Sequence, residues 1–246
     1  MVSFDLITAA ALGPANPDPA KAAGEAALWP CAGLEEAAVG GLGGAAAGLG
    51  FLLARSSYAK ASEDKAAGGK SSERLIALVA PGGWIAERGG LMARGAQAFG
   101  IPPERLLIVR PRTEAEALWA LEEILRSGAA DLAIGAVEGA SLTQTRRLDM
   151  AAREAGATAA LVRVRPGSPL SAARRRWRIS ALPSAPDPWD DRAPGAPRWR
   201  AELLRRRDGA PGCWDLEWND ETARLDLVAG LAGDGLGQRL RTIAAA

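Results

Sequence analysis

The stretch from Ser171 to Trp218 reads SAARRRWRISALPS (171–184) and, after a proline-rich connection, PRWRAELLRRRDGAPGCWDLEW (197–218). Bulky apolar residues alternate with charged ones in three segments of this stretch, over 174–182, 198–206 and 213–218. Alternation with period two in aromatic and branched residues is typical of half-buried strands. The run RRDGAPG between the last two segments predicts a hairpin loop. The sequence therefore predicts antiparallel strands at this end of the fold.

Strands and helices alternate in the region before this stretch. Apolar runs and helical periods predict strands at 34–39, 75–80, 106–109, 131–137 and 158–164, with helices at 44–55, 85–99, 113–127 and 141–155. Such alternation predicts a parallel sheet with helices on both faces. We therefore expect an α/β fold with a mostly parallel central sheet, flanked by helices on both faces and extended by antiparallel strands at its C-terminal edge.

Composition divides the chain into three parts. We assign residues 1–30 to an N-terminal segment and linker, 31–218 to one domain and 219–246 to a flexible C-terminal tail, with short helices at 1–12 and 239–244, the latter a candidate for docking on a partner. The charged, small-residue run 56–73 has almost nothing to bury, so we interpret it as a disordered insertion, with a functional peptide as the alternative.

The N-terminus lacks the basic residues of a signal peptide, and no apolar run reaches the length of a membrane span. The chain contains no histidine, which excludes His-based acid/base catalysis and Ser-His-Asp triads. Its two cysteines have no metal-binding spacing, so we predict no metal site and two reduced thiols. These observations predict a cytoplasmic protein.

Positive charge is concentrated in the C-terminal part of the chain. Twelve arginines and four acidic residues lie between Arg163 and Arg207, although the whole chain carries a net charge of only +1. Such a concentration on a strand-rich region favours an anionic or acidic partner, and a solvated charged face is the alternative interpretation.

The order of these elements resembles the RecA-type core, and the chain is similar to the inducible mutagenesis protein A (ImuA) family, a degenerate RecA relative of bacterial DNA-damage tolerance. The resemblance covers about residues 33–218. It is carried by AGLEEAAVGG (32–41), by AFGIPPERLLIVRPRTEAEALWALEEILRSGAADLAIGAV (98–137), by TQTRRLDMAAREAGATAALVRV (143–164) and by the C-terminal stretch quoted above.

An active RecA-type ATPase needs a G-x-x-x-x-G-K-[ST] loop, whose lysine neutralises phosphates and whose hydroxyl holds Mg²⁺. The resemblance places Val39 to Phe51 (VGGLGGAAAGLGF) at this position, without lysine or hydroxyl. The degenerate phosphate-loop residues are Gly40, Gly41, Gly43 and Gly44. Two interpretations remain open for them: close packing of a helix on the sheet, or a weak phosphate cradle made of backbone alone.

Two further elements of the RecA-type ATPase are also missing from this sequence. The strand 131–137 ends without an aspartate, and Glu138 just beyond it is either a substitute Mg²⁺ ligand or a solvated loop acid. The position of the catalytic carboxylate is taken by residues 80–83 (APGG). We therefore predict no catalytic residues, no cofactor and no enzyme activity.

The resemblance also places DNA-binding loops after the strands 131–137 and 158–164. The first has shrunk to 138–140, and the second is the short, basic run RPGSPLSAARRR (165–176). The candidate DNA- or partner-binding residues are Arg165, Arg174, Arg175, Arg176, Arg178, Arg200, Arg205, Arg206 and Arg207. Guanidinium groups suit both phosphates and the carboxylates of an acidic protein. Trp177 and Trp199 are candidate stacking platforms, with a place in the core as the alternative.

The resemblance implies a non-catalytic adaptor in SOS-induced, error-prone translesion synthesis. Its implied partners are the family's Y-family polymerase-like protein ImuB, an error-prone replicative-type DNA polymerase, and RecA as a further candidate. Direct binding of single-stranded DNA or modulation of a RecA filament is the alternative hypothesis. A cryptic nucleotide-binding enzyme is the third.

Overall fold

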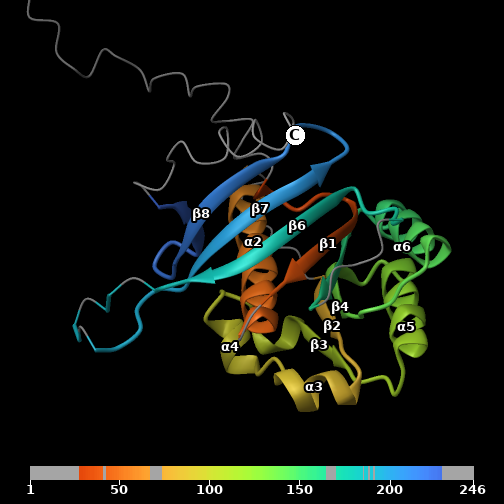
Figure 1. Cartoon of the computed structure of the whole chain (residues 1–246), viewed down its shortest axis with the longest axis horizontal. Helices are drawn as coiled ribbons and strands as arrows, with labels where there is room; N and C mark the ends of the chain where they lie inside the picture. Colours follow the sequence, from red (N-terminus) through yellow and green to blue (C-terminus); the bar gives the residue numbers. More distant parts are fainter. Residues whose placement is uncertain are drawn as a thin grey trace, which may run out of the picture.

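The structure is a computed structural model that describes residues 28–40, 43–66, 74–164, 170–184, 186–187, 189–190 and 192–228, without the side chains of 57–66. The helices predicted at 1–12 and 239–244 lie outside the described residues. The described chain forms one sheet of nine strands with helices on both faces (Figure 1). None of the helices within the described ranges is long and apolar enough to cross a membrane.

Six strands on one side of the sheet run parallel to one another, in the order β3-β2-β4-β5-β1-β6. Their bounds are β1 Gly33–Val39, β2 Leu75–Val79, β3 Leu106–Val109, β4 Ala130–Ala136, β5 Thr158–Arg163 and β6 Arg175–Leu182. The first strand of the chain therefore lies near the middle of the sheet, between β5 and β6. Parallel strands are covered on both faces, which is why most of them are recognisable as apolar runs.

Three strands extend the sheet in antiparallel fashion beyond β6: β7 Arg198–Arg206, β8 Gly212–Asn219 and β9 Arg224–Leu227. The antiparallel extension and the hairpin between β7 and β8 were both predicted. Strand β9 was not, and it lies inside 219–246, so the assignment of that whole range to a flexible tail is wrong for 224–227. Only its pairing with β8 reveals this short strand, because three of its four side chains are exposed.

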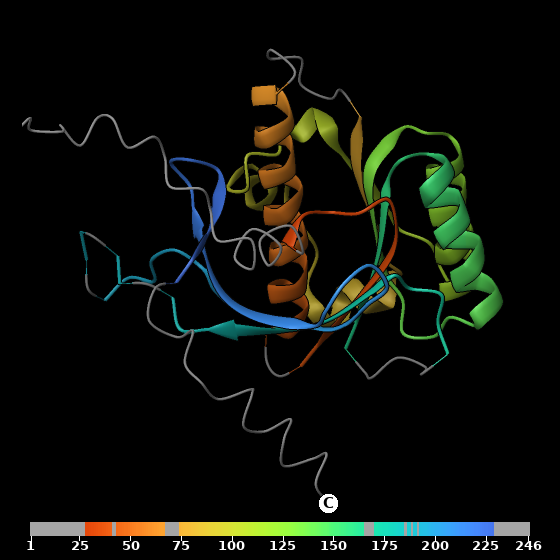
Figure 2. The same ribbon diagram turned by 90° about the horizontal axis from the view of Figure 1, so that it is seen from above.

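Helices cover both faces of the parallel strands (Figure 2). On one face, α5 (Glu114–Arg126) and α6 (Leu142–Glu154) pack on β4, β5, β1 and β2 around a core that includes Leu121, Leu148 and Leu161. On the other face, α2 (Gly44–Ala66), α3 (Gly82–Arg88) and α4 (Ala93–Gln97) share a second core with the apolar side of β6–β8. This architecture confirms the predicted fold class.

Helix α2 is the centre of the second layer. Strands β1, β5 and β6 contact it from the parallel part of the sheet. The antiparallel strands curl around it, so that β9 contacts it as well (Figure 2). From Gly44 to Arg55 every residue except Ala46 is buried. A helix that is apolar on all sides is expected to be enclosed.

The prediction that a disordered insertion spans 56–73 is wrong for residues 56–66, which continue α2. The run AKASEDKA (59–66) lacks bulky apolar residues but is rich in Ala, Lys and Glu, which have high helix propensity and extend a helix already formed. Residues 67–73 lie outside the described part of the chain.

The single helix predicted over 85–99 is also wrong, because the structure divides it into α3 and α4. Gly89 ends α3 with a φ of +82°, a left-handed conformation that favours glycine, and the chain regains helical form only at Ala93. A 3-10 turn at Pro103–Arg105 then leads into β3.

Candidate functional site

The turn between β1 and α2 lies outside the carboxyl end of a central strand, where open α/β sheets commonly bind ligands. Here the sequence placed the degenerate phosphate loop. Gly43 has a φ of +77°, which requires glycine, and α2 begins at the next residue. Gly41 lies outside the described residues.

Glycines in α2 hold the helix close to β1. A Cβ atom added at Gly44 would lie 3.5 Å from Val39, and one added at Gly48 would lie 2.5 Å from the Cγ1 of Val39. Close packing therefore explains Gly48, which sequence reasoning had not singled out, whereas a Cβ atom at Gly44 would make an ordinary van der Waals contact. Gly40, in contrast, has open space at the position of its missing Cβ. Residues 39–51 contain no Lys, Ser or Thr, so they do not fit a phosphate loop of the G-x-x-x-x-G-K-[ST] type.

The loop 138–140 is fastened to its neighbours by hydrogen bonds. The carboxylate of Glu138 accepts the Val164 N–H at 3.2 Å, and its backbone carbonyl accepts from Arg163 at 2.9 Å. The carboxylate of Glu114 accepts the N–H groups of Glu138 and Gly139 at 3.0 and 3.1 Å. These contacts give Glu138 a structural role. Among the residues that the structure describes, no group of three or more potential metal-ligating side chains occurs.

Two adjacent acids in the central strand β1 are buried on opposite faces of the sheet. Glu35 is fully buried and faces α2, whereas Glu36 is 5% exposed and faces the opposite side. Sequence reasoning missed both. The signal was present, since two consecutive glutamates in an otherwise apolar strand each need a buried partner.

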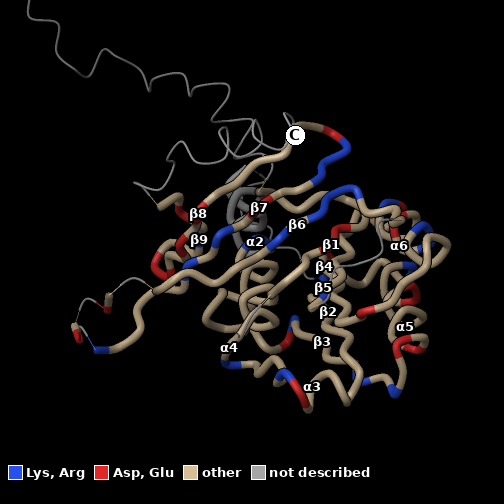
Figure 3. Tube along the Cα trace, in the orientation of Figure 1, with Lys and Arg blue, Asp and Glu red and all other residues tan. Residues whose placement is uncertain are grey.

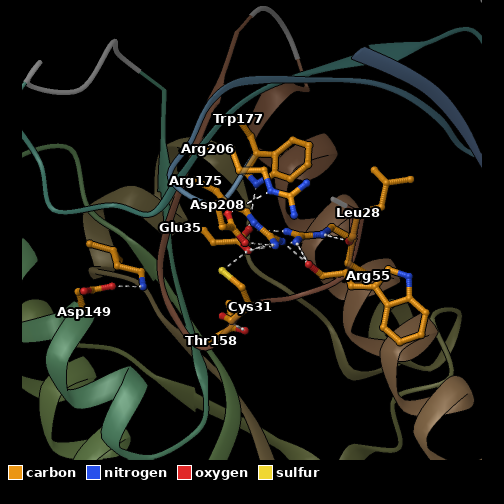
Figure 4. Close-up of polar contacts among 12 residues, drawn as sticks. Leu28, Cys31, Glu35, Arg55, Asp149, Thr158, Arg175, Trp177, Arg206 and Asp208 are labelled. Carbon is orange, nitrogen blue, oxygen red and sulfur yellow. Dashed lines mark hydrogen bonds and ion pairs between the residues drawn. The ribbon is translucent and has the colours of Figure 1, made fainter. Parts of the chain in front are cut away.

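Side chains from α2, from β6 and from the segment before β1 converge on the carboxylate of Glu35 (Figure 4). Arg55 of α2 donates to it at 2.6 and 3.1 Å, the indole N–H of Trp177 donates at 2.9 Å, and Arg175 lies at 3.5 Å. Burial by itself would raise the pKa of Glu35, but Arg55 and then Arg175 hold the pKa below its ordinary value. The group is therefore a buried carboxylate stabilised by two guanidinium groups.

The same arginines fasten the segment before β1. Arg55 donates to the backbone carbonyls of Leu28 and Trp29 at 2.6 and 3.0 Å, and Arg175 also donates to Trp29. Cys31 donates its S–H to Glu35, and burial together with that carboxylate raises the pKa of the thiol to about 12. A thiol with this pKa stays protonated near neutral pH and is unsuited to nucleophilic chemistry.

Glu36 has an equivalent set of partners on the other face of the sheet. It accepts hydrogen bonds from Arg163 at 3.0 Å and from the Ser171 hydroxyl at 2.7 Å, and Arg176 lies at 3.2 Å. Arg175 and Arg176, two of the candidate DNA- or partner-binding residues, are thus engaged by buried carboxylates. Arg175 is 4% exposed and Arg176 is half-buried, because each neutralises a glutamate of β1.

The charged side of the antiparallel strands faces away from α2 and consists of cross-strand ion pairs. Arg178 lies opposite Glu202 at 3.0 Å, and Arg198 lies opposite Glu217 at 2.5 Å. Arg200 pairs with Asp215 through two hydrogen bonds of 2.7 Å, which raise the pKa of its guanidinium group. Strand register therefore neutralises most of the positive charge on this face.

Near the start of β6 and the end of β7, four of the described arginines have no ion-pair partner among the described residues: Arg146, Arg174, Arg205 and Arg207. Arg174, Arg205 and Arg207 were predicted as candidate DNA- or partner-binding residues. They lie where β6 begins and β7 ends, beside α6 (Figure 3). Arg146, on α6, was not predicted. Arg206 pairs with Asp208 at 3.0 Å, a contact that lowers the pKa of Asp208. Arg165 lies outside the described residues.

Trp177 and Trp199 are 1% and 3% exposed, so both belong to the core and neither is a stacking platform at the surface. Trp177 packs edge-on against Phe51, and Trp199 packs against Phe99. The large exposed apolar side chains lie elsewhere. They include Trp119 on α5, Met150 on α6 and Trp189 in the β6–β7 connection, which are 63%, 57% and 94% exposed.

Comparison with known proteins supports the resemblance seen in the sequence. Protein ImuA from two strains of Caulobacter vibrioides is 41% identical over 144 residues, which cover 54% of this chain and 59% of the relative. The match thus spans about three fifths of these curated relatives, and it supports the ImuA family for this chain. No family model matches the sequence.

The crystal structure of the RadB recombinase superposes with a TM-score of 0.51, covering 79% of this chain and 90% of that one. The sequence identity of this pair is 12%, so the likeness concerns the fold alone. It confirms the RecA-like core.

Proposed function

We propose that this chain, a relative of Protein ImuA, is a non-catalytic RecA-like adaptor in SOS-induced, error-prone translesion DNA synthesis. In this role it works in the cytoplasm and recruits or regulates the Y-family polymerase-like protein ImuB and an error-prone replicative-type DNA polymerase, with RecA as a further partner. The identity to Protein ImuA and the RecA-like fold support this assignment at the level of the pathway.

The observation that carries the non-catalytic part is the construction of the β1–α2 turn. Gly48 lets α2 pack closely against Val39, and the first turns of the helix offer no lysine or hydroxyl to a nucleotide. The acid beyond β4, Glu138, accepts the Val164 N–H. Both features support a RecA-like body used as a scaffold.

The adaptor part is supported by exposed apolar side chains on well-packed helices. Trp119 projects from α5, whose other face contributes Leu118, Leu121 and Leu125 to the core. Exposed tryptophans on ordered elements are typical anchors of protein interfaces. A partner subunit would bury such a side chain without rearranging the sheet.

The test is co-purification of the chain with ImuB and the replicative-type polymerase, with and without ATP. We expect a complex that forms equally under both conditions and that Trp119→Ser weakens by about tenfold. Met92→Ser, which removes another exposed apolar side chain, is the matched control and should leave the complex intact. ATP hydrolysis above background, or a complex that requires ATP, would contradict the proposal.

The second candidate function is binding of single-stranded DNA or of a RecA filament, favoured by the three arginines without ion-pair partners at the β6–β7 end. Arg174→Ala, Arg205→Ala and Arg207→Ala together should then abolish a salt-sensitive affinity for an oligo-dT strand. Alanine changes at the paired Arg178 and Arg200 serve as controls. If the two sets behave alike, or if no DNA binds at low salt, the second candidate is discarded.

A further inference from the structure

A surface pocket of about 400 Å³ lies between α6 and the segment that leads into β6. It is separate from the β1–α2 turn, and it borders the buried Glu36 of β1 through Ser171, whose hydroxyl donates to that carboxylate. Its wall includes Leu142, Arg146, Asp149 and Met150 of α6, Ala172, and Arg207 from the end of β7. Three segments that are distant in the sequence therefore build it.

The charge of this pocket is positive. Arg146 is exposed and makes no hydrogen bond or ion pair with the described residues, and Arg207 donates to the backbone carbonyl of Ala172 at 3.2 Å. Asp149 is already engaged, because its carboxylate accepts the Leu34 N–H at 3.0 Å and lies 3.8 Å from Arg153. Two guanidinium groups at the same pocket thus lack a carboxylate.

Apolar surface accompanies these charges. Met150 is 57% exposed at the pocket, Leu142 is half-buried in its wall, and Leu170 is 66% exposed next to the Ser171–Ala172 segment. Methionine adapts to differently shaped apolar partners and is common at binding surfaces. The pocket therefore combines an apolar wall with two guanidinium groups that have no carboxylate partner among the described residues.

We propose that this pocket binds an acidic peptide segment of a partner protein, with a bulky apolar side chain entering beside Met150 and carboxylates pairing with Arg146 and Arg207. Guanidinium groups match carboxylates in charge and in planar, two-point geometry. This proposal rests on the proposed adaptor function, because it names the kind of partner that the adaptor would bind. The observations that support it are the charge and the apolar surface of the pocket.

A peptide fits these observations better than a nucleic acid does. Single-stranded DNA binds along a track of cations with aromatic platforms for its bases. On this protein Trp177 and Trp199 are buried, and Arg178 and Arg200 of the antiparallel strands are paired with carboxylates. A phosphate backbone would also leave Met150 without an apolar partner.

The experiment selects random peptides displayed on phage against the full wild-type chain, with counter-selection on Arg146→Glu. We expect enriched peptides that carry several acidic residues around one aromatic or branched aliphatic residue. By fluorescence polarisation, Arg146→Glu should weaken a synthetic copy of an enriched peptide by about tenfold or more. Met150→Ser should also weaken it, without changing any charge.

The matched control is Arg110→Glu, which makes the same charge change at an exposed arginine that follows the edge strand β3. It should leave peptide affinity unchanged. Circular dichroism and thermal unfolding establish that each variant is folded, and the exposed position of Arg146 makes its loss harmless to packing.

The proposal is overturned if selection enriches no acidic peptide, or if Arg146→Glu and Arg110→Glu affect binding equally. It is also overturned if an oligo-dT strand binds the same site more tightly than any selected peptide. These outcomes are independent of the co-purification with ImuB. If peptides bind but no complex with ImuB forms, the proposed partners are wrong and the proposed peptide site stands. If the complex forms but no acidic peptide binds, only the proposed peptide site is wrong.

Discussion

At the scale of single residues, the most unusual feature is Glu35, a carboxylate in the middle of a central strand. Burying an isolated charge is costly, so such groups occur only with partners that restore their hydrogen bonds. Arg55, Trp177 and Arg175 supply these partners from α2 and β6. Glu35 therefore joins β1 to α2, β6 and the segment 28–31 in one polar cluster.

This cluster makes the stability of the fold depend on pH. The folded state holds the pKa of Glu35 below its ordinary value of 4.5, so the stabilisation is present above that pH and is lost as pH falls through the lower, folded-state pKa. Glu35→Gln should lower the free energy of unfolding at neutral pH by about 3 kcal/mol. As the pH is lowered below about 4.5, the free energy of unfolding of Glu35→Gln should fall less steeply than that of the wild type.

Urea unfolding followed by tryptophan fluorescence between neutral and acidic pH measures this difference. Glu154→Gln, at the exposed end of α6, is the control and should remain within about 0.5 kcal/mol of the wild type. Parallel pH curves for Glu35→Gln and the wild type would show that the carboxylate is not ionised in the folded protein.

At the scale of elements, the contact of α2 with β1 depends on glycine. Gly48 faces Val39 without room for a Cβ atom, and this lets the helix axis approach the sheet more closely than a side chain would allow. One glycine of the stretch 39–51, Gly48, thus has a packing role that the motif-like pattern did not distinguish from phosphate binding.

Gly48→Ala should destabilise the protein by about 1–3 kcal/mol, because the new methyl group would lie 2.5 Å from a stiff valine methyl. This is opposite in sign to the roughly 1 kcal/mol that Ala gains over Gly in a helix interior. Thermal and urea unfolding of Gly48→Ala, Val39→Ala and the double variant measure the coupling between the two sites.

Gly95→Ala in α4 is the control, since its new methyl group would meet its nearest neighbour at an ordinary 3.9 Å. It should be neutral or slightly stabilising. A Gly48→Ala protein as stable as the wild type would mean that α2 shifts away from β1 without cost.

At the scale of the whole molecule, the two ends of the sheet pack against helices in different ways. Strands β1 to β5 lie between two layers of helices. Strands β6 to β9 curl around α2 and close the second core (Figure 2). Strand β9 completes this enclosure, with Leu225 and the nearby Ala223 packed against that core.

A chain ending at Asn219 should therefore be less stable by about 2 kcal/mol or more, because it loses the burial of Leu225 and uncovers part of α2. A chain ending at Val228, whose N–H bonds to Asp215, retains β9 and should unfold at the same denaturant concentration as the full protein. Equal stability of the two truncations would show that β9 contributes nothing to the fold.

Sequence patterns predicted the elements whose burial is one-sided or complete. The apolar strands β2 to β5 and the alternating strands β6 to β8 were recognisable because each must face a core. The continuation of α2 to Ala66, the break at Gly89 and the strand β9 were not predicted, since helix extension, a left-handed glycine and edge pairing leave little hydrophobic signal.

The sequence by itself determined the order of strands and helices, the antiparallel end of the sheet, and the lack of Lys, Ser and Thr in residues 39–51. Only the tertiary structure decided which arginines are free. Arg175 neutralises a buried glutamate, Arg200 is paired across strands, and Arg207 lines a pocket, although all three belong to one basic stretch. The reason is physical: the charge that an arginine presents depends on the carboxylate opposite it, and strand register and the folding of distant segments place that carboxylate.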